Sequence, residues 1–223
     1  MKEDIKQYNS IAEDFKNIFG VMNAGSITEF KKSLSLVMKA TGTMIDFGCG
    51  TGDVIEHCKA LGWNGCGVDS SVEMVVLAQQ NTKADIRCED FANTSFESNS
   101  FDLVTSKYAM QTSADIAPIY DEAARLLKKD GHFVFLVGHP LRQFLEKKRQ
   151  GKDYYKKEIV ESIIFDGAMT VYEPTHTLTE YLGKDFTNHF NLIDLVERSD
   201  FPSSEQIGGD IYPTYLIITA QKK

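Results

Sequence analysis

The sequence predicts an α/β fold in which a mostly parallel sheet of seven strands is covered by helices on both faces. Short apolar segments typical of strands alternate five times with segments of helical periodicity between residues 41 and 139. The connections between them are short, which favours a parallel sheet with helices on both sides. The chain has 223 residues, a length that suits one domain of ordinary size.

The expected elements follow in order along the chain. The first forty residues have helical spacing, over 5–19 and again over 26–40. The alternating region then predicts strands at 43–47, 64–68, 84–87, 101–105 and 132–137, and helices at 51–61, 72–80 and 114–127. After an irregular, strongly charged stretch at 140–176, we expect a helix at 178–186 and strands at 192–196 and 214–220.

This order divides the predicted domain, residues 1–223, into four segments. Residues 1–40 form a helical cap, 41–139 the ligand-binding core, 140–176 a lid or substrate insertion, and 177–223 the last helix and strands. No internal repeat and no linker rich in proline or serine separates them.

Composition and charge exclude several classes of protein. Hydrophobic residues make up 42% and charged residues 25%, which excludes disorder and collagen-like repeats. No apolar run approaches the roughly 18 residues that cross a bilayer, and Met1–Asp4 begins no signal peptide. We therefore expect a cytoplasmic protein with no membrane partner. The net charge of −8, from 24 basic and 32 acidic residues, opposes non-specific binding to nucleic acid.

The cysteines predict neither disulfides nor a metal site. Cys49, Cys58, Cys66 and Cys88 contain no CxxC pair and have no histidine at zinc-finger spacing. A secreted disulfide framework would be denser in so short a chain. We interpret the cysteines as reduced thiols and expect no metal.

The most informative segment is the one from Met44 to Asp53, where a strand runs into three glycines and then a helix. Gly48, Gly50 and Gly52 stand at alternate positions. Glycine allows positive φ and lets the backbone approach a ligand without a Cβ clash. The helix amino terminus offers free N–H groups. A tight turn alone needs one glycine, so three favour a ligand-binding loop.

The spacing of the glycines argues against NAD. A dinucleotide fingerprint is G-x-G-x-x-G, whereas the third glycine here comes one place early and Asp53 stands where it should be. A phosphate loop would need Gly-Lys-Ser/Thr, which is absent. Asp46, at the strand end, would repel a pyrophosphate but attract an ammonium or sulfonium cation.

Two further carboxylates are predicted at the same edge of the sheet. Asp69 ends the second strand, about 20 residues beyond Asp46, where an acidic side chain can accept both hydroxyls of an adenosine ribose. Asp90 follows the third strand and can accept from an exocyclic amine, while Phe91 can pack on a purine ring. Each aspartate alone reads as a loop residue, but three together favour a nucleoside site.

At this point the sequence resembles the class I S-adenosylmethionine-dependent methyltransferases, small-molecule branch. Residues 46–52 (DFGCGTG) are similar to the first motif of that family, and the resemblance continues through 67–74, 88–91, 101–106 and 126–134. In the last of these, Lys129 and Asp130 replace the family's proline and first glycine. The resemblance implies a Rossmann-like sheet whose last strand is antiparallel, with S-adenosyl-L-methionine as cofactor.

The resemblance also implies roles for individual residues. Asp46, Gly48, Cys49 and Gly50 would surround the methionine part of the cofactor, and Gly52 would open the helix. Asp69 would bind the ribose, with Ser70 and Met74 near the adenosine, and Asp90 and Phe91 would contact the adenine. Lys107 and Tyr108 would border the methyl donor. Tyr8 and Phe15, from a helix resembling the family's amino-terminal one, would close the site.

The acceptor is less well defined, because methyl transfer depends on alignment more than on a fixed catalytic residue. The Asn/Asp-Pro-Pro-Tyr/Phe signature of enzymes that methylate amines of nucleic-acid bases is absent, so a small-molecule acceptor is the default, most simply at oxygen. His139, at the end of the fifth strand, is a candidate general base. Its alternative is a turn residue that caps backbone groups. His176 is a second substrate-site candidate, or a neighbour of a helix cap.

The basic segment 142–157 leaves a rival interpretation open. It holds seven basic and two acidic residues, so it could dock RNA or an acidic protein. The simpler interpretation is a solvated helical lid. The rivals are thus an RNA or protein methyltransferase and, from another class, a cofactor-binding regulatory protein without transferase activity.

Overall fold

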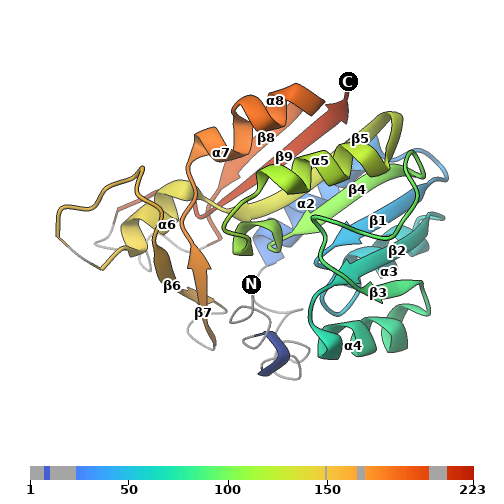
Figure 1. The fold of residues 1–223 in the computed structure, drawn as a ribbon, viewed down its shortest axis with the longest axis horizontal. Helices are drawn as coiled ribbons and strands as arrows, with labels where there is room; N and C mark the ends of the chain where they lie inside the picture. Colours follow the sequence, from blue (N-terminus) through green and yellow to red (C-terminus); the bar gives the residue numbers. More distant parts are fainter. Residues whose placement is uncertain (1–7, 11–23, 149, 165–168, 201–209) are drawn as a thin grey trace.

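A computed structural model of the chain describes residues 8–10, 24–148, 150–164, 169–200 and 210–223. Its centre is a seven-stranded sheet in the order β3-β2-β1-β4-β5-β9-β8 (Figure 1). The pairs from β3 to β5 are parallel, and β9 is antiparallel to both β5 and β8. The predicted fold class, with an antiparallel last strand, is confirmed.

The strands occupy the positions that the apolar segments predict. They are β1 (Thr43–Phe47), β2 (Asn64–Asp69), β3 (Ile86–Cys88), β4 (Phe101–Lys107), β5 (Leu127–Gly138), β8 (Phe190–Arg198) and β9 (Tyr215–Lys222). β1 lies between β2 and β4, so its carboxyl end is at the middle of the parallel half. In such a sheet, this edge is the usual place for a ligand.

Helices cover both faces of the sheet (Figure 1). On one face lie α2 (Ala24–Val37), α3 (Asp53–Ala60) and α4 (Val72–Thr82), whose buried residues pack together with Met44, Leu103 and Val134. On the other lie α5 (Ala117–Leu126), α7 (Leu178–Leu182) and α8 (Lys184–His189). Both cores consist of buried hydrophobic side chains that pack the helices against the sheet.

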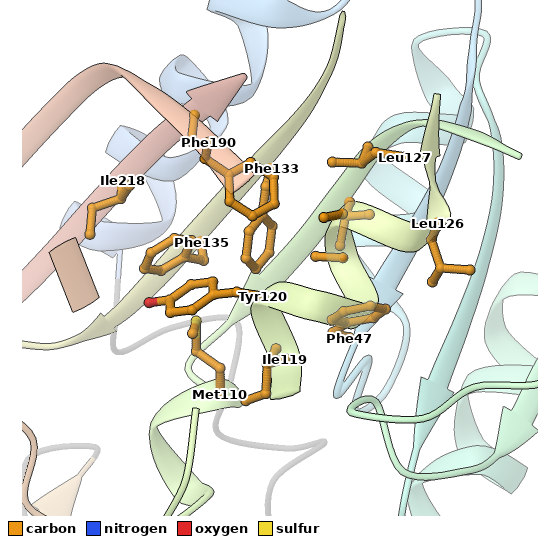
Figure 2. Packing of buried hydrophobic residues seen from close by; sticks show 14 of the residues in the cluster. Phe47, Met110, Ile119, Tyr120, Leu126, Leu127, Phe133, Phe135, Phe190 and Ile218 are labelled. Atoms are coloured by element: carbon orange, nitrogen blue, oxygen red, sulfur yellow. The ribbon is translucent and has the colours of Figure 1, made fainter. Parts of the chain in front are cut away.

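Tyr120 is the centre of the second core. Its ring lies 5.8–6.4 Å from those of Phe133, Phe135, Phe186 and Phe190, and Figure 2 shows it between Met110, Ile119 and the β5 phenylalanines. Because a buried phenol needs a partner, its hydroxyl donates to the Tyr181 carbonyl at 3.1 Å. This contact ties α5 to α7.

Some element boundaries differ from the prediction. The helix expected from residue 114 begins at Ala117, with a proline in its first turn, where the missing N–H costs nothing. The fifth strand begins at Leu127, five residues early, and has an irregular register near Phe101. The helix expected at 178–186 is two helices that meet at Gly183, where an added Cβ would lie 2.3 Å from the Thr179 carbonyl oxygen.

The prediction that 140–176 is irregular is wrong. This segment contains α6 (Pro140–Glu146) and an antiparallel pair, β6 (Ile159–Ile164) and β7 (Met169–Pro174). The pair stands apart from the main sheet beside α6 (Figure 1). Within the parts of the chain that the structure describes, no helix is long and apolar enough to cross a membrane.

The turn from β1 into α3 yields a stability prediction. Gly52 has φ +86, and an added Cβ would lie 2.4 Å from Thr82 Cγ2 on α4, whereas Gly50 has φ +51 and open space around it. Gly52→Ala should therefore cost about 2–4 kcal/mol of unfolding free energy, and Gly50→Ala about 1 kcal/mol. Urea denaturation of both variants measures this. An equal loss of unfolding free energy in Gly52→Ala and Gly50→Ala would contradict a steric role of the α3–α4 contact.

Candidate active site

A large pocket opens at the carboxyl ends of β1, β2 and β4. It contains about 1190 Å³ of empty space, open solvent included. Its lining comes from both the alternating core and the later segments: Tyr8, Gly48, Cys49, Gly50, Thr51, Asp53, Asp69, Ser70, Met74, Phe91, Lys107, Tyr108, Ala109, Gln111, Thr112, Arg142, Ser162, Val171, Glu173, Asp200 and Thr214.

The glycine loop forms one side of this pocket in a left-handed backbone conformation. Gly48 and Gly50 have φ of +66 and +51, and an added Cβ at Gly48 would lie 2.2 Å from Ala109 Cβ. The loop is held to β2 by the Cys49 N–H, which donates to the Val68 carbonyl at 3.0 Å. Only glycine fits Gly48, for reasons of both φ and space.

Asp69 holds the same loop from β2. The Gly50 N–H donates to its Oδ2 and the Ser71 N–H to its Oδ1, both at 2.9 Å. Burial raises the pKa of this carboxyl, and the backbone N–H donors oppose the rise. A carboxylate has about four acceptor sites, so Asp69 has capacity to accept hydrogen bonds from a ligand in the pocket.

The apolar part of this side comes from α4 and the β3–β4 connection. Ser71 caps α4 by accepting the Met74 N–H at 3.2 Å, which places Met74 and Ser70 in the lining. Phe91 also lines the pocket and stacks on Phe47, with ring centroids 6.1 Å apart and planes 18° apart. This surface is flat and apolar, as a purine requires.

Lys107 and Tyr108 line the pocket where β4 ends. The Lys107 ammonium is buried and pairs with Asp53 Oδ2 at 2.5 Å. Tyr108 has φ +55, an uncommon conformation for a non-glycine residue that recurs at functional sites. Its hydroxyl lies 3.5 Å from Asp200 Oδ2. Tyr8 lines the same pocket.

Three of the predicted cofactor residues do not line the pocket, and a fourth is not described by the structure. Gly52 is behind the loop, at the start of α3. Asp90 is exposed, and its Oδ1 accepts the Ala92 N–H at 2.9 Å. Phe15 lies outside the described residues. Asp46 does not line the pocket: it faces its register partner Thr105, whose hydroxyl donates to it at 2.6 Å.

Asp46 is nevertheless the most perturbed acid beneath the loop. It is 2% exposed, and burial raises its pKa to about 7. The Thr105 hydrogen bond opposes the rise and the Asp53 carboxylate adds to it. Lys107 lowers the pKa and Asp69 raises it further. The two protonation states of Asp46 are thus close in free energy near neutral pH.

The structure argues against the prediction that His139 is a general base. His139 is the N-cap of α6, and its Nδ1 accepts the Leu141 N–H at 3.1 Å. In the neutral ring Nε2 then carries the proton and donates to Glu197 Oε1 at 2.7 Å. Burial lowers the pKa of the ring, while Glu197 opposes this. His139 does not line the pocket, and the capping alternative is supported.

His176 is also outside the pocket lining. It precedes the α7 N-cap, Thr177, and its Nε2 donates to the Gln111 carbonyl at 3.0 Å. Burial lowers the pKa of its ring. It therefore supports the pocket wall through Gln111, as a neighbour of a helix cap.

The basic segment is engaged within the fold. Lys147 is 2% exposed, and its ammonium donates to the carbonyls of Asp153 and Lys156 at 2.6 and 2.5 Å. Lys148 pairs with Glu161 on β6. Arg142 lies in the pocket lining beside Glu146, Nε to Oε1 2.9 Å. The expected helical lid is thus wrong in part, because α6 ends at Glu146 and Lys147 is buried. Lys148 and Lys156 are exposed to solvent, as expected.

Sequence reasoning missed most of the far side of the pocket. Its polar residues come from short or distant elements: Gln111, Thr112, Ser162, Glu173, Asp200 and Thr214. No spacing rule links them, since they meet only in the folded chain. One signal existed: Glu173 stands three residues before His176, a substrate-site candidate predicted from the sequence.

Comparison with known proteins supports the expectation for the core. Residues 45–135 match the family described as "Methyltransferase domain". A ubiquinone/menaquinone biosynthesis C-methyltransferase from Campylobacter jejuni is 26% identical over 177 residues, 71% of this chain and 73% of the relative. A demethylmenaquinone methyltransferase from Lactococcus lactis is 24% identical, over 96% of this chain and 89% of the relative.

Solved structures share the fold. An S-adenosylmethionine dependent methyltransferase from Mesorhizobium loti superposes with a TM-score of 0.67 at 19% identity, covering 86% of this chain and 97% of the other. A 1,6-didemethyltoxoflavin-N1-methyltransferase from Burkholderia thailandensis gives a TM-score of 0.68 at 16% identity, covering 98% and 87%.

The glycine loop, the pocket and these comparisons define an enzyme that transfers methyl groups. Residues 45–135 match a methyltransferase domain, and the resemblance to the class I S-adenosylmethionine-dependent methyltransferases that the sequence predicts is confirmed. Its methyl donor is S-adenosylmethionine, and the residues present fit that group: an acceptor carboxylate at Asp69, a flat apolar surface at Phe91 and a loop open to close approach.

Asp46 predicts a specific pH dependence of stability. Its folded pKa of about 7 exceeds the unfolded value of 3.8, so the folded state holds the proton longer and loses stability as pH rises between these values. Asp46→Asn removes this loss. The free energy of unfolding of Asp46→Asn, relative to that of the wild type, should therefore increase by about 2–3 kcal/mol from pH 5 to pH 8. Urea denaturation at both values tests this, and parallel pH profiles would contradict it.

His139→Ala tests the reassignment of that residue. Loss of the cap should cost about 1 kcal/mol of stability, while the rate of methyl transfer per folded molecule stays within about threefold of wild type. A general base would instead be worth about 10²–10⁴-fold. Thermal unfolding and initial rates with a neutral hydroxyl acceptor decide between the two.

Proposed function

We propose that the enzyme methylates a small molecule that binds on the far side of the pocket, facing the glycine loop. The observation that carries the proposal is the continuity of one pocket from the loop to a polar wall formed by α6, β6 and β7. The internal contacts of Arg142 and Lys147 leave fewer cations of the basic segment for docking of RNA or protein, which favours a small acceptor. Residues 41–139 then hold the cofactor, and 140–176 supply the acceptor side.

In this proposal the donor lies along the loop. Gly48, Cys49 and Gly50 flank its methionine part, Asp69 accepts the ribose hydroxyls, and Ser70 and Met74 lie beside the adenosine. Phe91 packs on the adenine, with Asp90 at its rim, and Lys107, Tyr108 and Tyr8 enclose the reacting end. S-adenosylmethionine supplies an electrophilic methyl carbon on a sulfonium. The chain aligns the two reactants and excludes water.

The acceptor is proposed to bear an ionisable hydroxyl group. Deprotonation makes such a group nucleophilic at its oxygen and, in a phenol, at the adjacent ring carbon. Asp200 is the proposed proton acceptor, because it lines the pocket 3.5 Å from the Tyr108 hydroxyl. Oxygen is the first candidate atom. Carbon is the second, favoured by the relatives named as C-methyltransferases.

The cofactor assignment is tested at Asp69. Calorimetry should find micromolar binding of S-adenosylmethionine and S-adenosylhomocysteine and none of NAD. Asp69→Ala should weaken both by about 10- to 150-fold, the scale of charge-assisted hydrogen bonds. Asp185→Ala, at an exposed site on α8, is the control and should bind normally. Unchanged affinity in folded Asp69→Ala would remove that residue from the site.

The reacting atom is read directly from the product. Methyl-¹³C donor and a panel of small phenols, with product NMR, distinguish an O-methyl from a C-methyl group by chemical shift. Methylation of RNA or protein with no turnover of any small molecule would overturn the proposed acceptor class.

A further inference from the structure

The acceptor side of the pocket contains a buried carboxylate that the proposed reaction does not use. Glu173, on β7, lines the pocket yet is only 4% exposed. We call its surroundings the acceptor wall, made of Gln111, Arg142, Ser162, Val171 and Glu173. These residues come from η1 (Met110–Thr112), α6, β6 and β7.

The acceptor wall holds Glu173 as a hydrogen-bond acceptor. The Gln111 amide donates to its Oε2 at 2.7 Å, and the Gln143 amide donates to its Oε1 at 3.3 Å. Both amides are fixed in this orientation, because their oxygens accept the N–H groups of Gly138 and His176 at 2.5 and 2.8 Å. Two fixed donors of this kind hold the carboxylate in one orientation, with both of its oxygens as acceptors.

Arg142 is the one cation of the wall: burial lowers its pKa, and two carboxylates, Glu146 and Glu173, raise it above its usual value. Ser162 Oγ lies 2.8 Å from Glu146 Oε2 and 3.1 Å from Glu173 Oε1, and its single proton serves only one of them. Arg142 pairs with Glu146. In the part of the chain that the structure describes, no ion pair within 4.0 Å involves Glu173. Asp200 is a further carboxylate of the pocket lining.

Arg142 pairs directly with Glu146 and not with Glu173. A buried carboxylate without a directly bonded cation is costly, and here the pocket opens onto it. We propose that the acceptor wall is a subsite for a cationic nitrogen of the acceptor, an ammonium or protonated ring nitrogen that contacts Glu173. This nitrogen docks and does not react, so the methyl group goes to another atom of the acceptor. The inference rests on the proposed function and sets the acceptor apart from neutral quinones.

Three phenols that differ in one side-chain group test the subsite. Tyramine carries an ammonium, 4-ethylphenol is neutral and 4-hydroxyphenylacetate carries a carboxylate. Calorimetry on protein saturated with S-adenosylhomocysteine should show tyramine binding at least ten times more tightly than 4-hydroxyphenylacetate, with 4-ethylphenol between them. The proposal is overturned if the three phenols bind with equal affinity or if none of them binds.

Variants assign the effect to Glu173. E173Q should lower tyramine affinity about tenfold or more and leave 4-ethylphenol within a factor of two. In E173Q two amides would face each other at positions 111 and 173. The double exchange Q111E/E173Q restores one donor, one acceptor and one negative charge to this pair of positions. It should therefore regain the preference for tyramine. Asp185→Asn is the exposed control.

The outcomes for the two proposals are separable. Intact binding of S-adenosylhomocysteine with equal affinity for the three phenols would reject the cationic subsite alone. Absence of any binding of the cofactor by the wild type would reject the proposed function itself. If E173Q retains full preference for tyramine, Glu173 is not the contact and the proposal fails.

Discussion

The left-handed backbone between β1 and α3 is the constraint on which the cofactor side of the pocket depends. Gly48, Gly50 and Gly52 all have positive φ, so the chain turns sharply enough for the helix to begin directly beside the sheet edge. Asp69 and Val68 then clamp this turn to the neighbouring strand. The loop is thus shaped by the sheet beneath it, and a ligand meets a surface that is already in place.

The acceptor side obeys a different principle. It is held by side-chain hydrogen bonds between η1, α6, β6 and β7, and it uses no regular loop geometry. Such a network is specific only when all its members have partners. Within one pocket, the cofactor side is thus held by backbone geometry and the acceptor side by side-chain hydrogen bonds.

Local patterns were enough to predict the strands of the main sheet and much of the cofactor side. β1 has the predicted ends, and Asp69 and Phe91 lie in the pocket, because glycine conformation and apolar alternation act over a few residues. Contacts between distant residues were not predictable. His139 is paired with Glu197, 58 residues later, and Asp46 turns toward Thr105 on another strand. Only the folded sheet decides those partners.

The buried ammonium of Lys147 has a mechanical consequence. Its bonds to Asp153 and Lys156 join the end of α6 to the loop that leads into β6. If this loop alone moved away from α6, the buried Lys147 ammonium would lose both of its carbonyl acceptors, which is costly for a cation out of solvent. The end of α6 and this loop are therefore coupled, because separating them breaks both hydrogen bonds of a buried cation.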